Sequence, residues 1–246
     1  MKVSIITIAY NNEREIGRTI ESVLAQNYTD IEYLVIDGAS SDGTVAKAQE
    51  YRPAFEKKGM SYHIFSEPDR GIYDAMNKGI LQAQGDIIGI LNSGDRYAPG
   101  AVRTAVETFQ RTHCELMFGD IRIYVNEKQG FVKKARQRRF YQTSRDWNHP
   151  SMFVKSQLYK QYPFRGLGVH DDYGFYLRMR KQKRKIVVVN QLMASFYMGG
   201  ASNCKSLKAA IKRIMDRYRF CYRINGYSRW YLAECIGIEA AKWLFG

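Results

Sequence analysis

The sequence predicts an α/β fold with a mostly parallel sheet, and three observations lead to this class. Short apolar runs at residues 3–9, 33–37 and 86–91 are typical of buried parallel strands. The segments between them repeat their apolar residues at helical spacing. Strands that alternate with helices in this way form βαβ units, in which the crossover is right-handed.

The remaining elements are predicted from the same periodicity. The first helix is expected at residues 13–26, after Asn11 and Asn12, which are good N-cap residues. A helix expected at 71–85 ends at Gly85, which we interpret as the glycine that follows a helix C-terminus. Further elements are expected as helix 43–57, strand 61–67, helix 101–112, strand 114–125, a basic stretch at 133–139, helix 170–182, strand 185–197 and helical structure over 207–246.

Composition limits the classes of protein to consider. The chain has 246 residues, 45% of them hydrophobic, so it can bury a substantial core. We expect one large domain at 1–202 and a basic amphipathic helical extension at 203–246. Lys and Arg number 38 against 24 Asp and Glu, and this excess predicts attraction to nucleic acid, anionic lipid or phosphorylated substrates.

The compartment is predicted from the cysteines and the apolar runs. The four cysteines form no CxxC pair, which indicates neither a zinc site nor a disulfide scaffold and fits a reducing cytosol. The N-terminal run is short and β-branched, so we interpret it as a first strand rather than a signal peptide. Without a run of eighteen uncharged apolar residues, no membrane span is expected.

The segment VIDGASSDGT places Asp37 at the end of a predicted strand. Ligands of open α/β sheets collect beyond the carboxyl ends of the strands, so Asp37 is positioned to accept a hydrogen bond from a base or a ribose. An ordinary turn with Asp42 as N-cap explains the segment equally well. A dinucleotide-binding Rossmann site is disfavoured, because the first strand is followed by YNNE and not by a glycine fingerprint.

The segment SEPDRGIYDAMNK carries several charges around the start of a predicted helix. Asp69 and Arg70 lie just before this helix, and Asp74 and Lys78 lie on it. A carboxylate can orient a nucleotide, and a cation can offset the charge of its diphosphate. A solvated amphipathic helix explains Asp74 and Lys78 as well, whereas a simple turn does not need both Asp69 and Arg70.

The segment GDIIGILNSGD leaves the carboxylate of Asp95 just beyond another apolar strand. A carboxylate in this place is a hard oxygen ligand suited to Mg²⁺ or Mn²⁺, which bridge phosphate oxygens and need few protein ligands. Taken alone, an aspartate after an apolar run is more often a turn residue.

The chain resembles a family 2 glycosyltransferase of the GT-A fold, because several of its segments occur in the order found in that family. These segments are VSIITIAYNNE, VIDGASSDGT, SEPDRGIYDAMNKGI, LNSGD, HDDYGFYLRM and FYMGGAS. The resemblance covers about residues 1–202. It implies an inverting transfer of a sugar from a nucleotide-sugar donor, usually a UDP-sugar, assisted by a divalent metal, Mn²⁺ or Mg²⁺.

The resemblance also implies roles for single positions. Asp95 matches the metal-binding region, where Asn92 and Gly94 replace the family's acidic residues and leave one carboxylate, which puts metal affinity in question. The positions that match nucleotide-contacting segments are Thr7, Ala9, Tyr10, Glu13, Asp37, Asp69, Arg70, Lys78, Asn92, Ser93 and Gly94.

Within HDDY, Asp172 matches the family's catalytic aspartate, and Asp171 stands in place of its glutamate. A carboxylate can take the proton from the acceptor hydroxyl as that hydroxyl attacks the anomeric carbon. Two adjacent carboxylates disfavour each other's ionisation, which tends to raise one pKa. The pair can equally cap the following helix, and both roles can hold together.

Four further positions are candidates for contact with the acceptor or substrate. His149 could be a ligand or a buried histidine with its hydrogen bonds satisfied, and Arg178 could brace a carboxylate or face water. Gly199 and Gly200 would allow a close backbone approach to substrate or form a tight turn.

The C-terminal residues 205–246 interleave cations with apolar and aromatic residues. Such a helix can lie on an anionic membrane, with Lys and Arg toward the headgroups. A helical hairpin packed on the rest of the protein is the alternative. The cations are Lys208, Lys212, Arg213, Arg217, Arg219 and Arg223.

Together these observations predict a hexosyl- or N-acetylhexosaminyltransferase that acts on a glycan or lipid-linked acceptor in the synthesis of a cell-surface polysaccharide such as a lipopolysaccharide or capsule. We expect it in the cytoplasm, peripheral on the inner face of the membrane. Nucleic acid is not expected as a partner, because no reader motif accompanies the charge. The rival hypothesis is a non-catalytic protein that binds a sugar nucleotide or a polyanion on the same fold.

Overall fold

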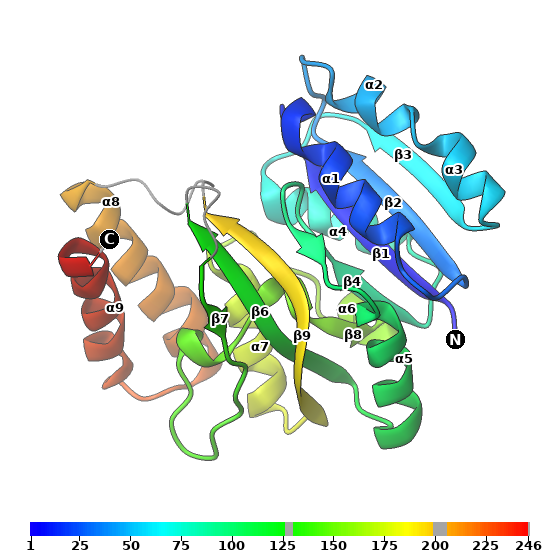
Figure 1. The fold of residues 1–246 in the computed structure, drawn as a ribbon. Coiled ribbons are helices and arrows are strands. Elements are labelled where there is room, and N and C mark those ends of the chain that lie inside the picture. Colours follow the sequence, from blue (N-terminus) through cyan, green and yellow to red (C-terminus); the bar gives the residue numbers. More distant parts are fainter. Residues whose placement is uncertain (126–129, 199–205, 246) are drawn as a thin grey trace. The chain divides into compact units, whose positions relative to one another are not determined.

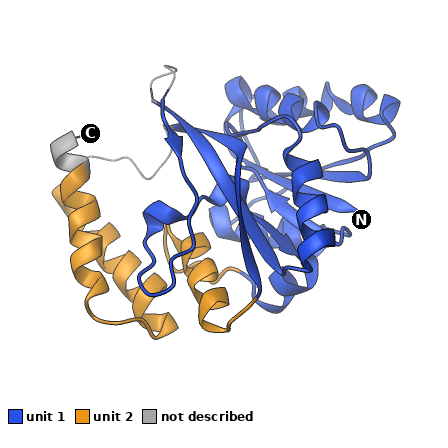
Figure 2. Ribbon diagram, turned by 60° about the horizontal axis from the view of Figure 1, so that its bottom comes forward, with its two compact units in different colours: residues 1–163, 185–197 blue, residues 164–184, 198–246 orange. Residues whose placement is uncertain are grey.

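The computed structural model describes residues 1–125, 130–198 and 206–245. By their contacts the residues form two compact units (Figure 2). The first comprises Met1–Pro163 and Lys185–Tyr197, and the second comprises Phe164–Arg184 and Met198–Gly246. The predicted domain boundary at 202/203 was drawn from the sequence and not from contacts, and it stays a prediction.

The first unit is built on one sheet whose strand order is β3-β2-β1-β4-β8-β6-β9-β5, with β7 paired to β6 (Figure 1). The neighbours β3, β2, β1 and β4 are parallel, whereas β8 is antiparallel to both β4 and β6. The bounds are β1 Val3–Ala9, β2 Ile31–Asp37, β3 Ser61–Ser66, β4 Ile87–Ile90, β5 Arg96–Tyr97, β6 Leu116–Val125, β7 Val132–Lys133, β8 Phe153–Lys155 and β9 Ile186–Met198.

Helices cover both faces of this sheet (Figure 1). The main core lies under α1 (Glu13–Leu24) and α5 (Ala101–Thr112), where Ile16 and Ile20 pack with the buried residues Val3 and Ile5 of β1. The opposite face of the parallel strands is covered by α4 (Ile72–Gln82), whose Gly79 lies against Ile6. Alternate residues of β1 therefore face different layers, as expected for a strand buried on both sides.

The remaining helices of the first unit are short. They are α2 Thr44–Gln49, α3 Arg52–Lys57 and α6 Ser156–Gln161, with single 3-10 turns at Ser144–Asp146 and His149–Ser151. The single helix expected at 43–57 is wrong in one respect, since the chain breaks at Glu50 and Tyr51 and restarts with Pro53 in the first turn of α3. Proline lacks the N–H that a continuous helix needs, but it fits the first turn.

The interpretation of Gly85 as a C-terminal helix glycine is also wrong. Helix α4 ends at Gln82, its C-cap is Ala83, and Ala83 is extended. A Cβ at Gly85 would lie 2.5 Å from the backbone nitrogen of Ser4. Gly85 is therefore required by the close approach of two chain segments.

The second unit is helical within its described residues. It contains α7 Asp171–Lys181, α8 Leu207–Asp216, a π-helical turn at Arg217–Tyr222, a 3-10 turn at Arg223–Asn225 and α9 Tyr231–Phe245. The hydroxyl of Tyr222 lies 3.1 Å from that of Tyr173 on α7 and donates to Glu234 on α9 at 2.8 Å. These contacts join the C-terminal helices to α7.

A buried ion pair holds α8 to α9. Arg213 donates through Nε and Nη2 to the Glu239 carboxylate at 3.0 and 2.7 Å, and Arg217 lies 3.9 Å from the same carboxylate. Of the two interpretations of the tail, packing within the protein therefore holds for Arg213 and Arg217, which are buried and do not face a membrane. A buried arginine needs a charged partner, and Glu239 supplies it.

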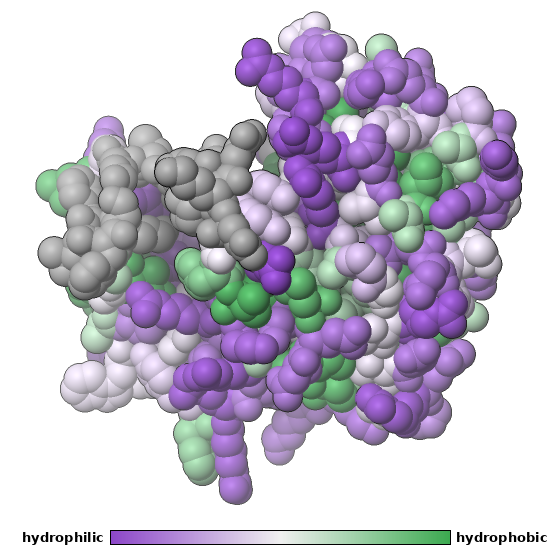
Figure 3. Space-filling view, viewed as in Figure 1, coloured by the Kyte–Doolittle hydropathy of each residue, from purple (hydrophilic) through white to green (hydrophobic). Residues whose placement is uncertain are grey.

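None of the helices in the described part of the chain is long and apolar enough to cross a membrane. On the face seen in Figure 3, hydrophilic side chains separate small apolar patches. Isolated exposed apolar residues of this kind are normal on folded proteins.

Candidate active site

The candidate nucleotide site is built where the parallel strands end. Ala9 of β1 pairs with Asp37 of β2, and Asp37 pairs with Ser66 of β3, so these three strand ends lie at one edge of the sheet. The pairing continues past β4, because the amide of Ser93 donates to the carbonyl of Ile8 at 3.1 Å. Four segments that are far apart in the sequence therefore meet at this edge, as expected where the carboxyl ends of parallel strands lie together.

Asp37 is fully buried at this edge and organises the turn that follows it. Its carboxylate accepts hydrogen bonds from the Ser40 amide at 2.9 Å, the Ser40 hydroxyl at 2.5 Å and the Ser66 hydroxyl at 2.7 Å. In the described structure the carboxylate thus links the ends of β2 and β3. Its predicted contact with a nucleoside stays a prediction.

Gly38 brings Asp69 and Tyr10 close to the end of β2. A Cβ at Gly38 would lie 2.4 Å from Asp69 Oδ2 and 3.3 Å from Tyr10 Cδ2. The Tyr10 ring is 66% exposed, so it presents an open aromatic face beside this carboxylate. Two of the residues assigned to the nucleotide, Asp69 and Tyr10, therefore both lie close to Gly38, where a larger side chain would meet them.

The other N-terminal candidates have local partners. Thr7 is buried, and its hydroxyl accepts a hydrogen bond from Tyr33 at 2.9 Å within the core. The Glu13 carboxylate accepts the Gly43 amide at 3.2 Å, which fixes the loop after β2 to the start of α1. Asn12 is the N-cap of α1 but makes no side-chain cap, and its Nδ2 donates to the Ser93 hydroxyl at 2.9 Å.

The charged segment before α4 forms a closed turn. Asp69 Oδ1 accepts the Gly71 amide at 2.7 Å, while Lys78 reaches back to the Glu67 carboxylate at 2.9 Å and to the Pro68 carbonyl at 2.7 Å. The Arg70 side chain is 92% exposed and lies 3.4 Å from Asp74. Arg70 is thus the cation of this segment that is most available to a ligand in solution.

The segment Asn92–Asp95 forms a tight turn after β4. The Asp95 amide donates to the Asn92 carbonyl at 3.0 Å, and Gly94 adopts φ +104°, a conformation open to glycine. The Gly94 amide donates to Thr19 of α1 at 2.9 Å. The replacement of an acidic residue by Gly94 therefore has a backbone reason in this protein.

Asp95 is buried beyond this turn with one oxygen unsatisfied. Its Oδ1 accepts the Tyr197 amide at 3.4 Å, whereas Oδ2 has no hydrogen-bond partner among the described residues. Removal from water raises the pKa of Asp95 to about 8. The neighbouring Asn92 Oδ1 is also buried and lacks a partner in the described structure.

Each of these two oxygen atoms is chemically of the kind that Mg²⁺ or Mn²⁺ binds. A buried carboxylate without a counter-charge is costly, and a bound Mg²⁺ or Mn²⁺ supplies that charge. No group of three His, Cys, Asp or Glu side chains suited to a metal occurs among the described residues. A metal held at Asp95 would therefore need further oxygen ligands from a substrate or from water.

Sequence reasoning missed Arg96, which directly follows Asp95. Its guanidinium lies 4.5 Å from the centre of the Tyr197 ring and 3.8 Å from the Glu15 carboxylate. The Tyr197 ring stacks on Tyr124 at 4.7 Å. The one signal in the sequence was the position of Arg96 next to Asp95, since its partners come from distant strands.

Asp171 and Asp172 begin α7 in the second unit. Asp171 is buried, and its Oδ2 accepts the amides of Arg165 and Gly166, the latter at 2.7 Å. The side chain of Asp172 is partly exposed. Asp171 thus anchors the preceding loop, and Asp172 is the carboxylate of the pair with more access to solvent.

The predicted rise of one pKa in this pair is found at Asp171, but its main cause differs. Burial raises the pKa of Asp171 most, the two backbone amides lower it, and the negative charge of Asp172 adds a smaller increase. The charge of Arg178 also lowers the pKa of Asp171, so Arg178 favours the ionised form of Asp171 rather than only facing water. The guanidinium of Arg178 packs 5.6 Å from the Phe175 ring.

The other predicted contacts have mixed outcomes. His149 lies in the first unit, is buried, and meets the ring of Trp147 edge-on at 5.9 Å. Gly199 and Gly200 lie outside the described residues. The contacts of these three residues with substrate stay predictions.

Comparison with known proteins gives the family context. The model of glycosyl transferase family 2 matches residues 4–182. The chain is 46% identical over 107 residues to the uncharacterized glycosyltransferase Rv1514c of Mycobacterium tuberculosis, which covers 43% of this chain and 38% of that protein. It is 32% identical over 124 residues to UDP-Glc:alpha-D-GlcNAc-diphosphoundecaprenol beta-1,3-glucosyltransferase WfgD of Escherichia coli, which covers 50% of this chain and 47% of that protein.

The putative teichuronic acid biosynthesis glycosyltransferase TuaG of Bacillus subtilis is 30% identical over 116 residues, or 47% of this chain and 45% of that protein. The chain thus spans less than half the length of these three curated relatives.

Two solved structures share the fold. Residues 1–349 of Staphylococcus aureus TarS in complex with UDP align with a TM-score of 0.63 and 17% identity, covering 100% of this chain and 73% of that one. Mannosyltransferase PcManGT from Pyrobaculum calidifontis, in complex with GDP-Man and Mn²⁺, aligns with a TM-score of 0.67 and 15% identity, covering 98% and 73%. The predicted α/β GT-A fold is thereby confirmed.

Proposed function

Because the chain belongs to glycosyl transferase family 2, we propose that it transfers a sugar from a UDP-sugar to a hydroxyl group of a lipid-linked or polysaccharide acceptor, with inversion at the anomeric carbon. Such a transfer would serve the synthesis of a cell-surface glycan. The observation that carries the proposal is the buried carboxylate of Asp95, whose second oxygen has no partner in the described structure, beyond the end of a parallel strand. A group of this kind is costly for stability unless a ligand completes it.

The donor nucleotide is assigned to the edge formed by β1, β2 and β3. Tyr10 offers an exposed ring for stacking on the base, and Asp69 and Asp37 offer acceptors for ribose or base N–H and O–H groups. Arg70, with its exposed guanidinium, is suited to the diphosphate. TarS and PcManGT, solved with UDP and GDP-Man, support a nucleotide-sugar donor.

Asp95 and Asn92 would hold the divalent metal, as their unsatisfied oxygens fit one. The metal would stabilise negative charge on the departing diphosphate. Arg96 lies next to Asp95 in the sequence, and its stacking on Tyr197 and contact with Glu15 fix its side chain. These residues therefore prepare a fixed environment for a phosphate-rich group.

Asp172 is the proposed general base. The acceptor oxygen attacks the anomeric carbon, the bond from that carbon to the diphosphate oxygen breaks with its electron pair, and the hydroxyl proton passes to the Asp172 carboxylate. Asp171 positions Asp172 by holding the loop before α7 through the amides of Arg165 and Gly166. This division of labour agrees with the burial of Asp171 and the partial exposure of Asp172.

The tail is the proposed site of contact with an anionic membrane from its cytoplasmic side. Leu207 and Ile211 are exposed one turn apart on α8, next to the exposed cations Lys208 and Lys212, and Trp230 is also exposed. Apolar side chains flanked by cations bind anionic interfaces. Liposome flotation of a Leu207→Ser, Ile211→Ser, Trp230→Ser variant tests this contact, and undiminished recovery with vesicles would remove it.

The catalytic proposal is tested by incubating the protein with Mn²⁺, a panel of UDP-, GDP- and dTDP-sugars as donors, and a polyprenyl-diphosphate-linked N-acetylglucosamine as acceptor. Transfer from one donor, lost in Asp172→Asn, is expected. Thermal shift under the same conditions reports binding, since a ligand of the folded state raises its stability. Metal-independent binding of UDP without transfer or hydrolysis would instead favour a non-catalytic sugar-nucleotide-binding protein.

A further inference from the structure

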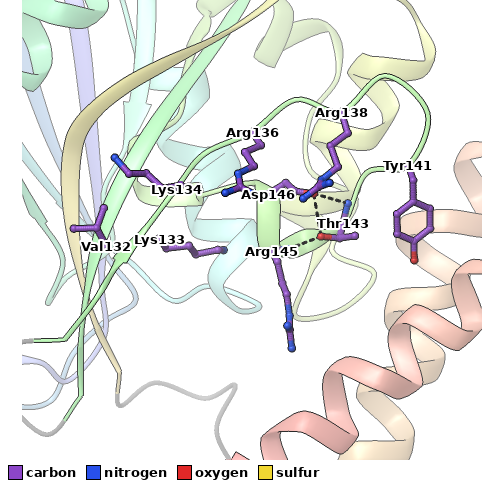
Figure 4. Close-up of a pocket in the computed structure, with 9 residues that line it drawn as sticks. All are labelled: Val132, Lys133, Lys134, Arg136, Arg138, Tyr141, Thr143, Arg145 and Asp146. Atoms are coloured by element: carbon purple, nitrogen blue, oxygen red, sulfur yellow. Dashed lines mark hydrogen bonds and ion pairs between the residues drawn. The ribbon is translucent and has the colours of Figure 1, made fainter.

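A basic pocket of about 550 Å³ lies in the first unit, on the segment that follows β6 (Figure 4). Its walls come from β7 and from the chain that follows β7. Strand β7 itself pairs with β6, with Lys133 opposite Ile121. The lining residues are Val132, Lys133, Lys134, Arg136, Arg138, Tyr141, Thr143, Arg145 and Asp146. Five of these nine side chains are cations, and one is an acid.

Two buried carboxylates hold the pocket in shape. Asp120 accepts the Ala135 amide at 2.8 Å and the Lys134 ammonium at 2.7 Å. Asp146 accepts the Arg138 Nε at 2.8 Å and forms a capping box with Thr143. Both carboxylates are almost completely buried, so their hydrogen bonds fix the backbone of the segment and not only its side chains.

The ammonium of Lys133 also stabilises the wall. It donates to the backbone carbonyls of Ser144 at 3.2 Å and Trp147 at 2.8 Å, which draws the two sides of the segment together. The amide of Arg136 donates to the Asp146 carbonyl at 2.8 Å, which closes the same segment from the other side. The pocket is therefore preorganised by contacts that leave some of its cations uncommitted.

The uncommitted cations are Arg136 and Arg145. Both side chains are exposed, and neither guanidinium makes an ion pair, hydrogen bond or ring contact within the described residues. In Figure 4 their side chains extend from opposite sides of the Asp146 turn. Both residues line the same pocket, so an anion bound there meets these two guanidinium groups from two parts of the segment.

We propose that this pocket binds a phosphoryl anion, with Arg136 and Arg145 as its principal ligands. A guanidinium presents paired N–H donors that match two oxygens of a phosphate, and a diphosphate fits easily within the pocket volume. The phosphoryl group is either that of a diphosphate-bearing molecule or that of a phospholipid headgroup. If the bound phosphoryl group belongs to a sugar acceptor, that role of the pocket rests on the proposed sugar transfer. The binding of the anion itself does not depend on that proposal.

The test measures anion binding without any donor sugar. Inorganic pyrophosphate is titrated calorimetrically into the wild-type protein and into an Arg136→Gln, Arg145→Gln variant. The control variant, Lys57→Gln with Arg111→Gln, removes two exposed cations of the first unit that make no ion pair in the described structure. Flotation of the same three proteins with phosphatidylglycerol and with phosphatidylcholine vesicles distinguishes the two sources of phosphate.

We expect the pocket variant to lose about tenfold or more in affinity for pyrophosphate, because two charge-assisted hydrogen-bonding groups are removed, while the control keeps its affinity. A matching loss only with phosphatidylglycerol vesicles supports the proposal with a headgroup as ligand. Equal binding by all three proteins to pyrophosphate and to vesicles overturns it. Both replaced side chains are exposed, and an unchanged circular dichroism spectrum verifies that the variant is folded.

Discussion

The buried carboxyl group of Asp95 should make the metal-free protein less stable as the pH rises. Burial raises the pKa of Asp95 from 3.8 to about 8. The folded state therefore holds this proton more tightly than the unfolded chain does, and between these two pKa values folding is linked to proton uptake. Stability is highest where the group is protonated in both states and falls as the pH rises toward 8.

The magnitude follows from the width of this interval. Between pH 4 and pH 7 the effect extends over about three pH units, each corresponding to about 1.4 kcal/mol, so up to about 4 kcal/mol of unfolding free energy is at stake. Relaxation of the site and entry of water reduce this figure, and about 2–4 kcal/mol is the expected range. Asp95→Asn removes the titration and keeps an acceptor for the Tyr197 amide.

The assay is urea unfolding at pH 5, 6 and 7 with a chelator present. As the pH rises, the unfolding free energy of Asp95→Asn should increase relative to that of the wild type by about 1 kcal/mol per pH unit. Glu107→Gln, which replaces an exposed carboxylate on α5, is the control and should follow the wild type at every pH. Parallel profiles for Asp95→Asn and the wild type would refute the reasoning from burial.

Three further perturbations test other parts of the molecule. Asp172→Asn should lower the rate of transfer about 10²–10⁴-fold while calorimetry still detects nucleotide binding, and near-normal turnover would exclude Asp172 as base. Gly38→Ala places a methyl group against Asp69 and should weaken nucleotide binding by about 1–3 kcal/mol, which calorimetry of UDP measures; unchanged affinity would separate this turn from the nucleotide. Glu239→Gln leaves Arg213 and Arg217 buried without their shared counter-charge and should lower the unfolding free energy by about 3–5 kcal/mol, whereas Arg213→Met combined with Glu239→Leu leaves one buried cation in place of two and should cost less; equal losses in urea unfolding would contradict this assignment.

The first half of the fold could be predicted from the sequence because its signals are local. The apolar run at 3–9 matches β1 at both ends, and the helical periodicity after Asn12 matches α1. The short strands β5, β7 and β8 were harder to predict, whereas the long strands β6 and β9 match the predicted runs to within two residues. Strand β8 has three residues, too few for a clear pattern in the sequence. Its place in the sheet is set by pairing with β4 on one side and with β6 on the other, both far away along the chain.

The candidate site shows the same limit. The end of a predicted strand placed Asp37 at this edge, whereas Tyr10 and Asp69 were assigned to the nucleotide through the family resemblance, and the structure brings both close to the residue after Asp37. The state of Asp95 could not be predicted in this way. Its weak hydrogen bond comes from the amide of Tyr197, which lies 102 residues later in the chain.

The interleaved route of the chain affects how the protein can fold during synthesis. Helix α7 leaves the ribosome before β9, which belongs to the first unit, and before the residues that cover Tyr173 and Gly174. Domains generally fold as units as they emerge from the ribosome. The first unit needs β9 to complete its sheet, so it can finish folding only after α7, which belongs to the second unit, has been synthesised. Until residues 222–225 are made, Tyr173 and Gly174 of α7 lack the hydrogen bonds that the C-terminal segment supplies in the folded protein.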